Sequence, residues 1–258
     1  MRNLIDNNPT LLRLIARYHG QPSRLVHEDR WPTEVQAPVR ELLQASAAGE
    51  RRLRNWMHST WELDSTFCYD FAESRHRIAL LRANELQSLK LYCGAAIHSA
   101  KITRAIDRTT QTQFRELLGE KAYNFALKRA SFLVGKLPDE LKPHTTTPDQ
   151  ILGSGQLCLA ACVHDAPDEL HRRLEFAGPG SGGFQHAPVA GVARLQTENQ
   201  KPIRTLASPA TANPATSVPA MDQWRLEATT TEHTPAIWAF VKRILLTEIV
   251  PELKPCFA

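Results

Sequence analysis

Apolar residues recur at helical spacing along most of the chain, and the apolar–polar alternation typical of strands is rare. The first predicted helix begins at Asn8, a residue suited to an N-cap and followed by proline, and it ends near Gly20. A second helix begins near Pro38 and is interrupted at Gly49, and a further short helix covers 50–61. This pattern predicts a mainly α, irregular multi-helix single domain.

The densest apolar pattern lies within residues 75–135. Small and aliphatic residues occupy one helical face there: Leu86, Leu89, Cys93, Ala96, Ile97 and Ala100. Gly94 falls inside this helix and is a candidate for a kink or a break, because glycine weakens a helix interior. Farther along, Gly119 is predicted to end a short helix.

The segment between these two helices separates apolar from basic positions. Ile102, Ala105 and Ile106 are predicted to continue the apolar face. The solvent side carries basic residues at i, i+3 and i+7: Lys101, Arg104 and Arg108. The same spacing therefore predicts one buried and one exposed face.

The next helix has a clear start and an uncertain interior. Thr147 is followed by proline, which is typical of a capped helix start. Gly153 and Gly155 argue against an unbroken helix beyond it. A last short helix is predicted over 168–176.

The chain divides by composition into three parts. Residues 1–177 form the predicted helical body. Glycine, proline and serine are frequent in 178–233, which is predicted to be a flexible insertion or linker. Residues 234–258 are apolar over more than one narrow stripe, so we expect a C-terminal helix that docks on the body.

Composition supports a folded protein of a reducing compartment. The chain has 258 residues, of which 42% are hydrophobic, and this is enough for a sizeable core. Its five cysteines fit no disulfide framework, and their thiols are expected to act as small apolar side chains. No signal peptide and no apolar run of about 18 residues is visible. We therefore expect a cytoplasmic protein without direct membrane insertion.

No catalytic sequence motif is complete in this chain. The glycine-rich stretch after Gly178 lacks the Lys-Ser/Thr pair of a phosphate-binding loop, and neither G-x-S-x-G nor H-E-x-x-H occurs. The best metal candidate joins Cys158 and Cys162 to neighbouring acids and histidines: His164, Asp165, Asp168 and His171. It lacks the paired-cysteine knuckle of a structural zinc site, and we favour buried thiols beside surface acids. We also interpret His98 as a structural histidine. The sequence predicts no enzyme and no cofactor.

Two segments are candidate partner-binding sites. The first is a basic run that contains Arg51, Arg52, Arg54 and Trp56. It fits either an acidic partner or phosphate, or else a solvated helix face with Leu53 and Trp56 packed inward. The second is the C-terminal helix with its aromatic residues: Trp238, Phe240 and Phe257. This helix either closes the fold or binds a partner.

Two packing motifs and the C-terminal ending resemble the YscK/SctK family. Residues 85–102 read as a leucine-rich turn, then Gly-Ala, then a small-residue turn that contains histidine. Residues 117–127 read as leucine, glycine and an acid, followed by Tyr/Phe, alanine and leucine. The ending, 244–257, is similar to the helical C-terminus of that family. The resemblance covers the central third of the chain best.

The resemblance implies a cytosolic component of the type III secretion sorting platform. Such an adaptor links the cytoplasmic domain of an SctD-like inner-membrane ring protein to an SctQ-like pod protein, and it performs no catalysis. Three alternatives stay open at this point. They are a helical nucleic-acid-binding regulator, supported by the net charge of +4 and two basic faces; an enzyme whose site is assembled from distant residues; and a chaperone or effector of the same secretion system.

Overall fold

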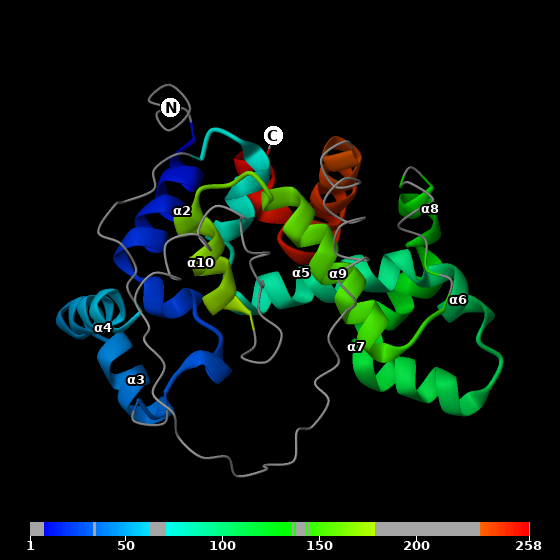
Figure 1. Ribbon diagram of the computed structural model, residues 1–258, viewed down its shortest axis with the longest axis horizontal. Coiled ribbons are helices and arrows are strands. Elements are labelled where there is room, and N and C mark those ends of the chain that lie inside the picture. Colours follow the sequence, from blue (N-terminus) through cyan, green and yellow to red (C-terminus); the bar gives the residue numbers. More distant parts are fainter. Residues whose placement is uncertain are drawn as a thin grey trace, which may run out of the picture.

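A computed structural model describes residues 8–32, 35–61, 71–135, 137, 143, 145–178 and 233–257. Within these ranges all regular structure is helical and no strand occurs, which confirms the mainly α prediction (Figure 1). Apart from its first and last residues, the predicted linker 178–233 lies outside the described residues. No helix in the described ranges is both long and apolar enough to cross a membrane.

The described residues of the N-terminal part form three α-helices and two 3₁₀ turns: α2 (Pro9–Gly20), η1 (Pro22–Leu25), η2 (Glu28–Arg30), α3 (Ala37–Gln44) and α4 (Ala47–Thr60). Asn8 caps α2 as predicted, since its Oδ1 accepts from the Leu11 N–H at 3.0 Å. The predicted break at Gly49 is wrong, because Ser46 caps α4 by accepting from the Gly49 N–H. Gly49 instead allows close packing, since a Cβ there would lie 2.1 Å from the Leu43 carbonyl oxygen.

The central part begins with η3 (Ser74–Leu80) and continues through six α-helices: α5 (Ala83–Ile97), α6 (Ser99–Arg104), α7 (Arg108–Lys128), α8 (Ser131–Val134), α9 (Pro148–Val163) and α10 (Asp168–Ala177). Gly119 breaks α7 at φ +71°, as its predicted role requires. Thr147 caps α9, and its hydroxyl accepts from the Gln150 N–H at 3.3 Å. The predicted break at Gly119 and the predicted cap at Thr147 are therefore both confirmed.

The helices α5 and α9 cross at the centre of the molecule with unusually close backbones (Figure 1). A Cβ on Gly94 would lie 2.0 Å from the Ile151 carbonyl oxygen, and one on Gly155 would lie 1.9 Å from that of Lys90. Neither glycine breaks its helix, so the expected kink at Gly94 and the expected interruption of α9 are both wrong. Both glycines are required by packing instead.

The C-terminal residues pack onto this central pair. Residues 233–244 are helical, a π turn follows over Leu245–Ile249, and a 3₁₀ turn covers Pro251–Cys256. Apolar side chains from these residues join the same core cluster as those of α2, α5, α9 and α10. The core is thus completed by the last described residues of the chain.

One buried arginine ties the C-terminal turn to the body. The Arg77 guanidinium donates to the carbonyl oxygens of Phe71 at 2.8 Å, Ala72 at 2.9 Å and Cys256 at 2.5 Å. Nearby, the Asn8 amide donates to the Pro255 carbonyl oxygen at 2.6 Å. The first described helix and the C-terminal turn are therefore held together.

Candidate interaction surfaces

The basic run lies in the middle of α4. The apolar stripe of this helix places Leu53 in the interior, and Arg51 and Arg52 face solvent. Arg54 is half-buried. None of these three guanidinium groups forms an ion pair with a residue that the structure describes.

Trp56 belongs to an aromatic cluster of the described residues Trp31, Trp56, Trp61 and Phe176. The ring centroid of Trp56 lies 6.1 Å from that of Trp31 and 5.3 Å from that of Trp61. Trp61 stacks on Phe176 at 4.5 Å. All three tryptophans are half-buried, so Trp56 packs inward while it keeps an exposed edge. The clustering of three of the five tryptophans within residues 31–61 was the sequence signal that could have revealed Trp31 and Trp61.

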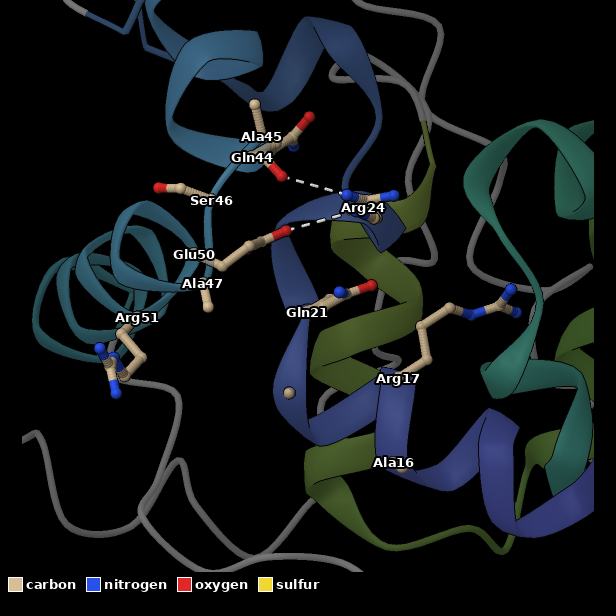
Figure 2. Close-up of a pocket in the computed structure, with 11 residues that line it drawn as sticks. Ala16, Arg17, Gln21, Arg24, Gln44, Ala45, Ser46, Ala47, Glu50 and Arg51 are labelled. Carbon is tan, nitrogen blue, oxygen red and sulfur yellow. Dashed lines mark hydrogen bonds and ion pairs between the residues drawn. The ribbon is translucent and has the colours of Figure 1, made fainter. Parts of the chain in front are cut away.

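A cavity of about 590 Å³ opens beside the basic run. It lies between the last turn of α2, η1, the α3–α4 turn and the first turn of α4 (Figure 2). Its polar lining includes Arg17, Gln21, Arg24, Gln44, Glu50 and Arg51.

The wall of this cavity holds one buried carboxylate, Glu50, which is only 4% exposed. The Ser23 hydroxyl lies 2.9 Å from both of its oxygens, and Arg24 Nε donates to Oε1 at 3.4 Å. The Gln44 amide in turn donates to Ser23 at 3.0 Å. This network satisfies the acid within the wall, as a buried charge requires.

The arginine side chains that line the cavity point in different directions relative to its opening. Arg17 points away from the opening and donates to the Leu80 carbonyl oxygen at 3.1 Å (Figure 2). Burial, followed by the charge of Arg82, lowers the pKa of Arg17. Arg24 has half of its side chain exposed and also donates to the Gln44 carbonyl oxygen at 3.1 Å. The guanidinium groups of Arg17 and Arg24 are thus held by acceptors within the protein.

The aromatic residues of the C-terminal segment divide between core and surface. Phe257 is 0% exposed, and Phe240 is also buried in the main core. Trp238 is half-buried, and its ring centroid lies 6.1 Å from that of Phe257. Phe257 therefore closes the fold, and a partner could reach it only if the C-terminal turn left the core. Of the three, Trp238 alone keeps some exposed surface.

The cysteines and His98, which the sequence offered as candidate site residues, have structural surroundings in the fold. Cys158 and Cys162 are buried, and burial raises the pKa of the Cys158 thiol to about 12, so the thiol stays protonated. No group of three or more potential metal ligands occurs in the part of the chain that the structure describes.

His98 lies between the hydroxyls of Thr146 at 2.9 Å and Ser154 at 3.0 Å, and burial lowers its pKa to about 4. It is a neutral histidine that joins α5, α9 and the turn before α9.

Asp165 belongs to an ion-pair network at the surface. Arg75 donates to both of its oxygens, at 2.7 and 2.5 Å, and His76 Nε2 lies 3.0 Å from Oδ1. Partial desolvation raises the pKa of Asp165, but the hydrogen bonds from Arg75 and His76 outweigh it and lower the pKa to about 2. The network links η3 to the turn before α10.

We expect Asp165→Asn to reduce stability by about 1 kcal/mol at neutral pH, since the carboxylate is partly exposed and screened by solvent. Because the folded-state pKa lies below the ordinary value, the ionised carboxylate stabilises the fold above about pH 4, and this contribution disappears as pH falls through 2. Urea unfolding from pH 7 to 2 measures the difference, with Glu116→Gln as an exposed control. A difference that stays constant over this range contradicts the prediction.

A second basic group lies far from α4. Lys101, Arg104 and Arg108 are exposed around the junction of α6 and α7. In Figure 1, α4 and this junction lie toward opposite ends of the long axis. The two basic faces are therefore separate surfaces, and neither extends the other into one stripe.

Comparison with known proteins gives one match. The family model described as YOP proteins translocation protein K (YscK) matches residues 17–208. No curated protein and no solved structure matches the chain. The match includes both packing motifs, 85–102 and 117–127, and it ends before the C-terminal ending that also resembled the family. Since the match covers well over half of the sequence, the chain belongs to the YscK family, a family of type III secretion proteins.

Proposed function

We propose that this protein is a non-enzymatic cytoplasmic adaptor of the type III secretion sorting platform. It links the cytoplasmic domain of an SctD-like inner-membrane ring protein to an SctQ-like pod protein. Membership of the YscK family is the observation that carries the proposal. Fold alone does not define function, so the proposal also needs suitable surfaces on this chain.

The geometry offers candidates for such surfaces. An adaptor must contact two partners at once, and this requires two regions that do not overlap. The α4 basic surface, defined here as Arg51, Arg52, Arg54 and the exposed edge of Trp56, is one of them. Arginine and tryptophan are frequent at binding hot spots, and unpaired arginines attract acidic partners.

Simultaneous replacement of Arg51, Arg52 and Arg54 by glutamate is expected to weaken one of the two partners at least tenfold. The reversal replaces attraction by like-charge repulsion, which slows association and destabilises the complex. Because all three side chains reach solvent, the melting temperature should change little. Titration calorimetry of the purified protein against each partner separately measures the effect.

A matched control reverses three exposed cations outside this surface: Arg13, Lys121 and Lys128. It changes the net charge equally and is expected to retain both affinities. If the α4 variant binds both partners like the wild type, the α4 surface has no role. If the wild-type protein binds neither partner, the adaptor function is wrong. Salt-dependent binding of generic duplex DNA that the α4 variant loses would favour the nucleic-acid-binding regulator.

A further inference from the structure

An exposed aliphatic side chain marks the junction of α6 and α7. Ile106 is 93% exposed, whereas Ile102, one helical turn earlier, is buried. The predicted continuation of the apolar face through Ile106 is therefore wrong. The reason is local, because α6 ends at Arg104 and Ala105 is extended (φ −67°, ψ 110°). The chain leaves the helical path there, and Ile106 turns outward.

This exposed position is held firmly from both sides. After it, Asp107 caps α7, since its Oδ2 accepts from the Thr110 N–H at 2.8 Å and the Thr110 hydroxyl at 3.0 Å. Before it, the Ala105 carbonyl oxygen accepts from the Gln111 amide at 2.7 Å. Ile106 is thus presented on a backbone that is already ordered, which lowers the entropy lost on binding.

Basic side chains surround the exposed isoleucine. Lys101 and Arg104 lie on α6, and Arg108 is the first residue of α7. All three are exposed, and none forms an ion pair with a residue in the described ranges. By contrast, Arg115 on the same helix pairs with Glu120 at 3.4 Å. We call the five residues Lys101, Arg104, Ile106, Asp107 and Arg108 the Ile106 corner.

We propose that the Ile106 corner is the second docking surface of the adaptor and fits an apolar pocket rimmed by carboxylates on a protein partner. This inference rests on the proposed function. It assigns the second partner to the end of the molecule opposite the α4 basic surface (Figure 1). The isoleucine fills the pocket, and the three cations pair with its rim. Charge complementarity then selects the partner and the orientation.

Asp107 favours a protein over the other polyanions. Its carboxylate is fully exposed next to Ile106, and its hydrogen bonds to Thr110 lower its pKa, so it stays ionised. Pressing the corner against anionic lipid or a nucleic-acid backbone would bring this negative charge against a uniformly negative surface. A protein rim has separate carboxylates and can leave the position opposite Asp107 free. One aliphatic side chain is also a weak membrane anchor.

The test uses two variants of the full chain that separate apolar contact from charge. Ile106→Ser removes the apolar side chain, and a triple replacement of Lys101, Arg104 and Arg108 by glutamate reverses the rim charges. Leu42→Ser is the matched control, because Leu42 is an aliphatic residue that is 75% exposed on α3. Each variant is titrated with the purified pod protein, with the ring-protein cytoplasmic domain, with anionic vesicles of phosphatidylglycerol and phosphatidylcholine, and with duplex DNA.

We expect both corner variants to bind one partner at least tenfold more weakly, while their melting temperatures stay unchanged. This partner should be the one that the α4 variant still binds with wild-type affinity. Leu42→Ser should bind that partner normally. Unchanged affinity of both corner variants for both partners overturns the inference and leaves the adaptor function standing. If the wild-type protein binds neither partner, the adaptor function fails. If the wild-type protein binds vesicles or DNA and the corner variants lose this binding, the assignment of the corner to a protein partner is wrong. If the wild-type protein binds none of the four probes, both the adaptor function and the Ile106 corner inference are wrong.

Discussion

Gly155→Ala is expected to destabilise the protein by at least about 2 kcal/mol, because a methyl group there has no room. Its Cβ would lie 1.9 Å from the Lys90 carbonyl oxygen, 2.8 Å from the carbonyl carbon and 3.2 Å from the Gly94 nitrogen. All three obstacles are backbone atoms of α5, so no side chain can rotate aside. The α5–α9 pair must separate, and the core around both helices loses contacts.

The same helix provides the control. Gly153 lies two residues earlier, and a Cβ there would have nothing within 4 Å. Gly153→Ala is therefore expected to stabilise the protein by about 0.5–1 kcal/mol, because alanine loses less backbone entropy in a helix. Urea unfolding of both variants measures the contrast in sign. Equal free energies of unfolding would show that α5 and α9 are not in close contact.

Arg77→Met is expected to cost about 3 kcal/mol or more, since it leaves three carbonyl groups without their charged donor. The methionine keeps most of the side-chain volume, so the loss reports hydrogen bonding and not a cavity. Because one of the three acceptors belongs to Cys256, the C-terminal turn should open first. Hydrogen exchange of residues 251–257 and thermal unfolding together measure the effect.

Arg13→Met is the control for this replacement, because Arg13 is exposed on α2. It should unfold like the wild type. If Arg77→Met matches the wild type in both stability and C-terminal hydrogen exchange, Arg77 does not hold the C-terminal turn. If exchange rises throughout the chain at once, the turn does not open separately from the rest of the fold.

Features set by neighbours in sequence were predictable. Asn8 and Thr147 cap their helices because a short polar side chain meets the free N–H groups of the next turn. Gly119 breaks its helix because its backbone adopts positive φ. The mainly α fold and the exposed position of Arg51 and Arg52 follow from helical periodicity in the same way.

Features set by distant segments were not predictable. Gly94 and Gly155 have the same local sequence signal as helix breakers, and only the approach of the other helix reveals their role. The acceptor that Arg77 finds on Cys256 lies 179 positions away. Ile106 continues the helical spacing of Ile102, but the helix ends at Arg104. Periodicity does not show where one helix stops and the next begins.

The hydrogen bond between Asn8 and Pro255 has a consequence for biosynthesis. Its two residues are 247 positions apart, so the N-terminal helix emerges from the ribosome long before its final contact exists. At elongation rates of about 5–20 residues per second, translation of the intervening chain takes roughly 10–50 s. During that time the core-facing residues Leu11, Leu14 and Tyr18 lack part of the surface that later covers them. The apolar face of α2 is therefore fully covered only after the residues around Pro255 have been synthesised and have reached the core.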